Sequence, residues 1–302
     1  MDISKLNLIL DIAETKNLTL SAEHMGYTQS GVSHAIHKLE AEMGISLLNR
    51  TNKGVELTVE GELLLPYIRT ISANYKRMDD ILDSIHGLQR GSICIGTYSS
   101  VAAQWLPHVL KEFREAYPNI SITIREGGIQ EIEQWLQEGS IDFGFLSQRK
   151  GQKYHFCPLA KDPLYVVTAK DYPLPKEYQS RFPARILGDY PYIASESGLD
   201  HDVAAALEST GVAPTITCRC SDDHTIVSMV TNGLGISLLP DMFLTGQDER
   251  LNKILLEPCY MRNLGICTMP DRTLSLASKT FINVSKTVIE RLTSEATETL
   301  LF

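Results

Sequence analysis

The stretch that decides the fold is LSAEHMGYTQSGVSHAIHKLEAEMG, residues 20–44. Two helical patterns flank a short turn, in which Gly26 suits the end of one helix and Thr28 the N-cap of the next. Apolar residues recur at helical spacing in the second helix and form its buried stripe: Val32, Ile36, Leu39 and Met43. The opposite face carries hydrogen-bonding side chains, namely Gln29, Ser30, Ser33, His34 and His37. This pattern is typical of a helix-turn-helix, although a three-helix bundle with a solvated polar face would share it.

The residues on either side favour the first alternative. Before the turn, DISKLNLILDIAETKN (residues 2–17) has apolar residues at helical spacing. After it, LLNRTNKGVELT (residues 47–58) places a turn between two short β-like runs, which predicts a wing. Arg50 and Lys53 stand where a wing reaches DNA phosphates, and Lys38 joins them as a phosphate contact. We expect Gln29, Ser30, Ser33, His34 and His37 to meet base edges or nearby phosphates.

At this point the sequence resembles the winged helix-turn-helix of the LysR-type transcriptional regulators. The residues that carry the resemblance are Ala22, Gln29, Val32, Ser33, Ile36, Leu39, Glu40, Gly44, Leu47, Arg50, Leu57, Thr58 and Gly61. Three positions depart from the family pattern: Ser30 stands where proline is frequent, His34 where arginine is usual, and Leu48 where phenylalanine is usual. The histidine leaves open the strength and the pH dependence of one DNA contact.

Residues 58–88 read as one long helix, with a mild kink expected at Pro66. Its apolar residues alternate spacings of four and three, which is the heptad stripe of a two-stranded coiled coil. The stripe consists of Leu64, Ile68, Ile71, Tyr75, Met78, Leu82 and Ile85. A helix packed on its own chain is the alternative. The resemblance implies a homodimer formed through this helix, and often a homotetramer.

The rest of the chain alternates strand and helix patterns. GSICIGTYSS, ISITIREG and IDFGFLS are strands separated by helices, so a parallel sheet covered on both faces is expected. A second α/β set follows Pro163, and the chain returns to the first sheet with LGICTM and a final helix. Two lobes joined by two crossings predict a periplasmic-binding-protein-like architecture. VTNGLGISLLP and EGSIDFGFLS resemble the regulatory domain of the same family.

Ligands of open α/β sheets bind beyond the carboxyl ends of the strands, so a small-molecule effector is expected between the lobes. The strand ends supply Thr97, Ser99, Ser100, Gly128, Ser147, Ser195, Ser197, Asp222 and Thr225. Ser99 and Ser100 open a helix, which suits an anion, yet serine at a helix start is also an ordinary cap. Asp200, Asp222 and Asp223 add acidity near the second lobe, beside His201, so a cationic or mixed-charge effector is open as well.

Composition narrows the class of protein. The 302 residues carry a net charge of −9, and 43% are hydrophobic. The N-terminus lacks the layout of a signal peptide, and no apolar run is long enough to cross a membrane, so we expect a cytoplasmic protein. The six cysteines are scattered, so we expect reduced, inert thiols and no metal or cofactor. No catalytic motif is present, which argues against an enzyme. A solute-binding protein of the export pathway would lack residues 1–88, and a thiol switch at Cys218 and Cys220 is poorly spaced.

These observations predict an α/β multidomain protein with a winged helix-turn-helix (residues 1–60), a linker helix for dimerisation (61–90) and an effector-binding domain (91–302). Lobe I comprises about 91–162 and 267–302, and lobe II about 163–266. The expected function is sequence-specific binding of double-stranded DNA at an imperfect palindromic operator, modulated by the effector. RNA polymerase is an expected partner if the protein is an activator.

Overall fold

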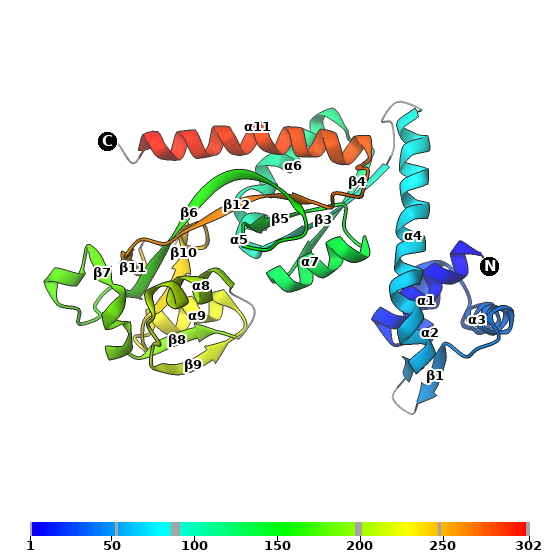
Figure 1. Cartoon of the computed structure of the whole chain (residues 1–302), viewed down its shortest axis with the longest axis horizontal. Helices are drawn as coiled ribbons and strands as arrows, with labels where there is room; N and C mark the ends of the chain where they lie inside the picture. Colours follow the sequence, from blue (N-terminus) through cyan, green and yellow to red (C-terminus); the bar gives the residue numbers. More distant parts are fainter. Residues whose placement is uncertain (1, 52–53, 86–90, 197–200, 247–248, 300–302) are drawn as a thin grey trace. The chain divides into compact units, whose positions relative to one another are not determined.

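The computed structural model describes residues 2–51, 54–85, 91–196, 201–246 and 249–299. The chain forms two compact units. One comprises residues 1–88 with 137–140, and the other comprises residues 89–136 with 141–302. We call them the N-terminal unit and the regulatory unit, and each is described by itself (Figure 1).

The N-terminal unit begins with three short helices, α1 (Ile3–Thr15), α2 (Leu18–Met25) and α3 (Gln29–Met43). Asp2, Asn17 and Thr28 cap their starts by accepting hydrogen bonds from backbone N–H groups of the first turn. α2 and α3 end at glycines in the left-handed conformation, Gly26 and Gly44. The predicted roles of Gly26 as a helix end and of Thr28 as an N-cap are confirmed.

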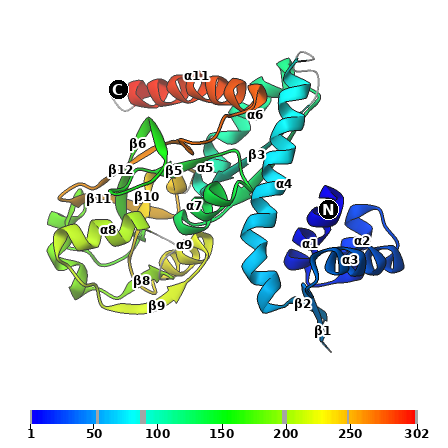
Figure 2. The same ribbon diagram turned by 45° about the vertical axis from the view of Figure 1, so that its right-hand side comes forward.

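A two-stranded antiparallel hairpin, β1 (Leu48–Thr51) with β2 (Gly54–Leu57), follows α3. It lies beside the lower end of the long helix α4 (Val59–Ile85), as Figure 2 shows. This hairpin is the predicted wing. α4 is continuous through Pro66, so the proline does not end the helix.

The core of the N-terminal unit gathers the apolar stripes of these helices. Val32, Ile36 and Leu39 of α3 are 0–6% exposed and pack with buried residues of α1. Ile68 of α4 is 3% exposed and joins the same core, and Leu64 is partly buried against it. The prediction that Leu64 and Ile68 face a partner helix is therefore wrong: the first turns of α4 use those side chains to hold the unit together.

The regulatory unit opens with the predicted β-α-β-α-β order. The strands β3 (Gly91–Thr97), β4 (Ile120–Glu126) and β5 (Phe143–Ser147) are parallel, with β3 in the middle. The connecting helices are α5 (Ser99–Gln104) with α6 (Leu106–Ala116), and α7 (Ile129–Glu138). The last helix, α11 (Leu276–Thr299), packs beside α6 (Figure 1). Together these elements form lobe I.

Two long antiparallel strands connect lobe I to the second set of elements. β6 (His155–Ala169) and β12 (Met261–Thr268) pair from Met261 opposite Pro163 to Thr268 opposite His155. β12 also pairs with β5, so it lies between β5 and β6 in the sheet order β4-β3-β5-β12-β6-β11-β7. These strands are the two predicted crossings.

Lobe II contains β7 (Arg181–Pro183), β8 (Tyr192–Ser195), α8 (His201–Thr210), β9 (Ile216–Cys220), α9 (Asp223–Thr231), β10 (Ser237–Pro240), α10 (Asp241–Leu244) and β11 (Leu251–Glu257). Two short 3₁₀ helices, Lys176–Tyr178 and Ala184–Asp189, flank β7. β8 and β9 are parallel, but β10 and β11 pair antiparallel with β6. The sequence predicted a second α/β set after Pro163, and the structure shows that its strands β10 and β11 extend the sheet of lobe I through β6.

Among the described residues, none of the helices combines the length and the apolar character that crossing a lipid bilayer requires.

Candidate nucleic-acid interface and ligand cleft

The polar face of α3 is open to solvent. Gln29, Ser30, His34, His37 and Lys38 are exposed, and Ser33 is half-buried. Ser30 Oγ lies 3.1 Å from the capping hydroxyl of Thr28, and His37 Nδ1 lies 3.6 Å from Glu40 Oε2. The six predicted residues of α3 therefore share one accessible side of the helix that follows the turn. Such a row of donors and acceptors suits the edges of base pairs and the phosphates beside them.

Other residues of the motif have structural tasks instead. Glu40 Oε1 accepts hydrogen bonds from the N–H groups of Leu47 and Leu48, at 2.7 and 3.2 Å, and so fixes the start of the wing. Thr58 caps α4 by accepting from the N–H of Gly61 at 3.0 Å. A Cβ on Gly61 would lie 2.4 Å from the carbonyl oxygen of Leu47, so only glycine lets the wing and α4 approach so closely.

The wing lies at the predicted place, but its tip is only partly described. Val55 donates its N–H to the carbonyl oxygen of Lys16 at 3.1 Å, which ties β2 to the turn between α1 and α2. The side chain of Arg50 and the whole of Lys53 lie outside the described residues. Their role as phosphate contacts stays a prediction.

A continuous apolar stripe runs along the exposed side of α4. Its members are 41–72% exposed: Val59, Leu63, Tyr67, Ile71, Tyr75, Met78 and Leu82. Ile71, Tyr75, Met78 and Leu82 were expected there, whereas Leu63 and Tyr67 take the places predicted for Leu64 and Ile68. The side chain of Ile85 lies outside the described residues. So large an exposed apolar surface on one helix is a mark of an interaction site.

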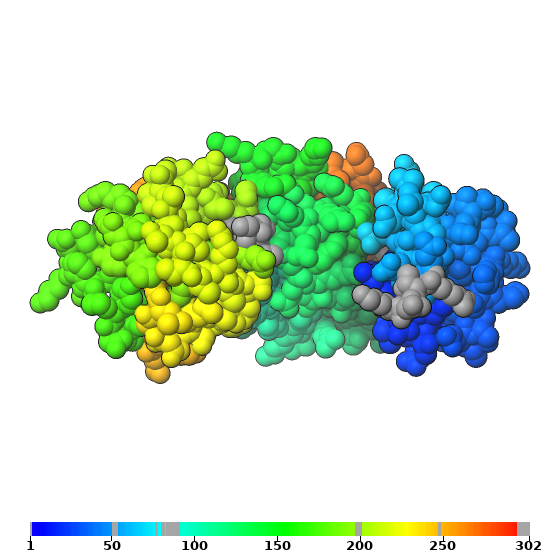
Figure 3. All heavy atoms as spheres, turned by 90° about the horizontal axis from the view of Figure 1, so that it is seen from below, coloured from blue at the N-terminus to red at the C-terminus, as the bar shows by residue number. Residues whose placement is uncertain are grey.

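A cleft of about 430 Å³ lies in the regulatory unit between elements of lobe I and lobe II. Lobe I lines it with Tyr98, Ser99, Ser100, Glu126, Gly127, Gly128 and Glu131. Lobe II and β12 line it with Ser195, His201, Asp202, Ser221, Asp222, Asp223, His224, Pro240, Phe243 and Arg262. Most of these residues follow the carboxyl end of a strand, where ligands of α/β sheets bind. Figure 3 shows the face on which the segments of α7 (green) and α9 (yellow) lie.

The structure brings five of the nine predicted effector residues to this cleft: Ser99, Ser100, Gly128, Ser195 and Asp222. Thr97 and Ser147 are fully buried behind it, and Ser147 Oγ lies 3.0 Å from the hydroxyl of Tyr98. Thr225 does not line it, because its N–H and hydroxyl bond the carboxylate of Asp222 at 3.0 and 2.7 Å. Placing Thr97, Ser147 and Thr225 at the cleft surface was wrong. Ser197 lies outside the described residues.

The charged centre at the floor of the cleft was not predicted from the sequence. Arg262, on β12, is 6% exposed. Its Nε donates to Asp162 Oδ2 at 2.6 Å, and one terminal nitrogen donates to Ser100 Oγ at 3.1 Å. The other terminal nitrogen lies 4.0 Å from Asp202 Oδ2, and the guanidinium lies over the ring of Tyr98. The partners are about 60 to 160 positions from Arg262 in the chain, so no local pattern reveals them.

Burial governs the ionisation of the carboxyl groups around Arg262. It raises the pKa of Asp162 and of Asp202 above the ordinary aspartate value, and the charge of Arg262 offsets this only in part. Burial also raises the pKa of Asp223, assisted by the neighbouring charge of Asp222. The pKa of Asp222 is lowered, because its carboxylate accepts hydrogen bonds from Thr225 and from the first N–H groups of α9.

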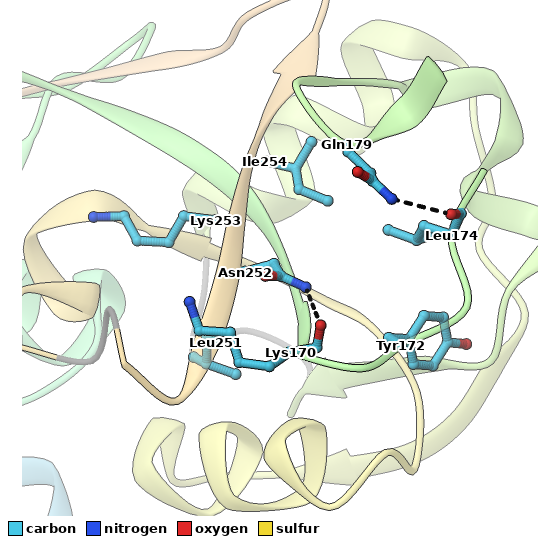
Figure 4. A pocket seen from close by; sticks show the side chains of 8 residues that line it. All are labelled: Lys170, Tyr172, Leu174, Gln179, Leu251, Asn252, Lys253 and Ile254. Carbon is cyan, nitrogen blue, oxygen red and sulfur yellow. Dashed lines mark hydrogen bonds between the residues drawn. The ribbon is translucent and has the colours of Figure 1, made fainter. Parts of the chain in front are cut away.

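A second cavity of about 460 Å³ lies in lobe II beside β11, between Lys170, Tyr172, Leu174, Gln179 and residues 251–254. The side-chain amides of its lining bond the protein itself. The amide of Asn252 donates to the carbonyl oxygens of Ala169 and Lys170, and that of Gln179 donates to the carbonyl oxygen of Leu174. Figure 4 shows the bonds to Lys170 and Leu174. The side chain of Lys253 points away from Gln179 and Leu174 and pairs with Asp241 at 2.8 Å. The interlobe cleft has the larger set of polar groups that face a ligand.

Comparison with known families places both units. Residues 3–62 match the family described as "Bacterial regulatory helix-turn-helix protein, lysR family", and residues 86–289 match the "LysR substrate binding domain". The HTH-type transcriptional regulator YvbU of Bacillus subtilis (strain 168) is 29% identical over 289 residues, which are 95% of this chain and 98% of YvbU.

Two solved structures share the fold. CbnR complexed with its target DNA has a TM-score of 0.69 at 17% identity and covers 95% of this chain and 100% of its own. The effector-binding domain of QuiR in complex with shikimate has a TM-score of 0.60 at 23% identity and covers 67% of this chain and 98% of its own.

Proposed function

The chain belongs to the LysR family and is a DNA-binding transcriptional regulator with an effector-binding domain, and from that premise we propose which of its surfaces perform each task. The relatives are transcriptional regulators, and we propose that this chain likewise regulates transcription without catalysing a reaction. Because its partner is chromosomal DNA, we place its action in the cytoplasm.

The face of α3 that carries Gln29, Ser30, Ser33, His34, His37 and Lys38 is the proposed DNA-reading surface. The observation that supports it is that five of the six side chains are exposed and Ser33 is half-buried, all on one side of the second helix of a helix-turn-helix. Gln29, Ser30, Ser33 and His34 are placed to meet base edges or nearby phosphates, whereas Lys38, Arg50 and Lys53 contact phosphates. Phosphate contacts position the protein, and base contacts specify the sequence.

The exposed stripe of α4, from Val59 to Leu82, is the proposed dimer contact, in which a second copy covers the same residues. Two copies related by a twofold axis would read two half-sites, so the operator is an imperfect palindrome. We further propose that two dimers form a homotetramer. If the protein activates transcription, we propose that it also contacts RNA polymerase. The interlobe cleft is the proposed effector site, and its occupancy would shift the relative orientation of the subunits and, through it, the DNA geometry.

Lys38→Ala tests the DNA-reading surface. Because Lys38 is assigned to phosphate, its loss should weaken binding about equally for all sequences and reduce the slope of log affinity against log salt by about one. Gln29→Ala should instead change the preferred sequence. The measurement is fluorescence anisotropy of the full-length protein with duplexes selected from a random library. Lys111→Ala, an exposed lysine of α6, is the control. An unchanged salt slope and unchanged sequence preference in the two α3 variants would move the interface elsewhere.

A further inference from the structure

The cleft offers a ligand negative charge, and we propose that the effector is a small organic cation, an ammonium or guanidinium compound, that binds beside Asp202 and Asp223. This inference rests on the proposed effector site and specifies the chemical class of its ligand. Serine hydroxyls at the start of α5 would suit an anion, so the choice depends on how the charges in the cleft are already engaged.

The single guanidinium of the cleft is occupied by the protein. Arg262 donates to Asp162 through Nε and to Ser100 through a terminal nitrogen. Its remaining terminal nitrogen faces Asp202, and one face of the group lies against Tyr98. A carboxylate or phosphate ligand would have to displace Ser100 or Asp202 to reach it. The displaced Asp202 would then be a buried carboxylate without its cation, which is costly.

The remaining charges of the lining are negative. Five carboxylates line the cleft, on Glu126, Glu131, Asp202, Asp222 and Asp223, and Arg262 is the one lysine or arginine among the described lining residues. His201 and His224 also line it. Even with both imidazoles protonated, negative groups outnumber positive ones. An anion entering this cleft is repelled, whereas a cation is attracted through a medium of lower dielectric than water.

The Asp202 carboxylate is the negative group of the cleft that we expect a cationic ligand to contact. It is 5% exposed, yet the Arg262 nitrogen that faces it stays 4.0 Å away, whereas a charge-assisted hydrogen bond is about 2.8 Å long. Asp162 takes the short bond from the same guanidinium at 2.6 Å. Two buried carboxylates thus share one cation, and the one that lines the cleft has the weaker contact. A cationic group of a ligand would complete the pairing of Asp202.

The aromatic and hydroxyl groups of the lining agree with such a ligand. Phe243 presents a ring to the cleft, next to His224 at a centroid distance of 4.9 Å, and aromatic faces attract cations. Ser99 and Ser195 supply hydroxyls for the polar remainder of the molecule. A cleft of about 430 Å³ suits a compound of metabolite size.

The test compares three probes with the same four-carbon chain: 1,4-diaminobutane, 1,4-butanediol and succinate. Agmatine, spermidine and choline extend the cationic set. Binding to the full-length protein is measured by isothermal titration calorimetry and by thermal shift. We expect binding by at least one amine, no binding by the diol or by succinate, and a loss of amine affinity of about tenfold in Asp223→Asn, because one charged hydrogen-bond partner is removed. Asp271→Asn, which removes an exposed carboxylate outside the cleft, should bind as the natural protein does.

Stabilisation by succinate, the absence of binding by every amine, or equal amine affinities of Asp223→Asn and Asp271→Asn would each overturn the cationic class. Asp202→Asn provides a second variant, since it also removes one negative charge from the cleft, in this case from its floor. DNA binding by the ligand-free protein is measured separately. If the protein selects DNA and responds to a carboxylate, the proposed function stands and the ligand class is wrong. If the protein selects no DNA, the proposed function itself fails.

Discussion

His34 occupies an exposed position on α3 where the family usually carries arginine. Arginine is charged at every accessible pH, whereas histidine gains its charge between about pH 8 and pH 6. A DNA phosphate beside His34 favours the charged imidazole, so binding takes up a proton and affinity should rise as pH falls through that range. One fully linked proton gives at most about tenfold per pH unit.

Measuring DNA affinity against pH at fixed salt, for the natural protein and for His34→Arg, checks this expectation. The arginine variant should bind more tightly at pH 8 and show a flatter profile. His37 is the next titratable residue on the same face, so His37→Gln serves as the control. Parallel profiles for the natural protein and His34→Arg would mean that His34 takes up no proton on binding.

Asp202 leads to a prediction about stability. Because burial raises its pKa in the folded state, the folded protein holds this proton more tightly than the unfolded chain does. The resulting stabilisation is complete below the ordinary aspartate pKa of about 3.9 and is lost as pH rises through the raised value. Asp202→Asn keeps a neutral group at every pH. It should raise the melting temperature of the ligand-free protein at pH 8 by about 2 °C and by less as the pH falls toward 4.

Several groups around Asp202 also affect its pKa, and the experiment has to separate their effects. Arg262, Tyr98 and His201 interact with it electrostatically, and Ser147 donates a hydrogen bond to it. His201→Gln, combined with Asp202→Asn, separates the titration of the imidazole from that of the carboxyl group. A gain in melting temperature that is constant between pH 5 and pH 8 would contradict the expectation.

At the scale of elements, α4 has two apolar sides with different tasks. Ile68 belongs to the core of the N-terminal unit, and Ile71, 41% exposed, belongs to the outer stripe. Ile71→Asp should abolish or strongly weaken self-association and lower DNA affinity while the unit stays folded. Ile68→Asp should unfold the N-terminal unit, because it buries an unpaired charge. Sedimentation velocity and circular dichroism measure the two effects, and an unchanged dimer in Ile71→Asp would exclude the stripe as the contact.

In α4 the sequence predicted only part of which apolar residues face outward. The heptad rule predicted the outer stripe correctly from Ile71 to Met78, where no two large apolar residues are adjacent in the chain. Near its start, Leu63 and Leu64 are adjacent in the chain, as are Tyr67 and Ile68. Periodicity alone accepts either member of each pair, because a helix that serves both its own core and a partner has apolar residues on two sides. Tertiary packing determines which member of each pair faces the core, and this cannot be deduced from the periodicity of a single sequence.

Local chemistry explains what was predicted well. Gly26 and Thr28 fix helix ends through interactions within a few residues, so the helix-turn-helix could be located from the sequence alone. Ser99, Ser100 and Asp222 were correctly predicted to line the cleft, because the pattern of a strand also shows where the strand ends. Arg262 was missed because its role depends on Asp162 and Ser100, which only the folded sheet brings near it.

Across the whole regulatory unit, Arg262 connects elements of both lobes. It bonds Ser100 of α5 and Asp162 of β6, and Asp162 in turn accepts from the N–H of Met242 in α10 at 3.0 Å. Breaking a buried pair leaves an uncompensated charge, so Arg262→Met should lower the free energy of unfolding by about 3 kcal/mol. Arg181→Met removes the exposed pair Arg181–Glu257 and should cost less than about 0.5 kcal/mol.

Tryptophan fluorescence during urea unfolding measures this difference. The chain has two tryptophans, Trp105 and Trp135, and both lie in the regulatory unit, so the signal reports on that unit. Equal losses in Arg262→Met and Arg181→Met would show that the buried pair does not hold the lobes together.

The place of β12 in the sheet has a consequence for synthesis of the protein on the ribosome. β12 is the last strand of the chain, yet it lies between β5 and β6 in the middle of the sheet. The nascent regulatory unit therefore cannot close its sheet until β12, which ends at Thr268, has left the exit tunnel, whereas the helix-turn-helix, wing and α4 of the N-terminal unit have all been synthesised by Ile85. A message cut short before β12 would yield chains with a folded DNA-binding unit and an unfinished regulatory unit. Such chains would compete for operators without answering to any effector, so a premature stop in this gene should act as a dominant allele.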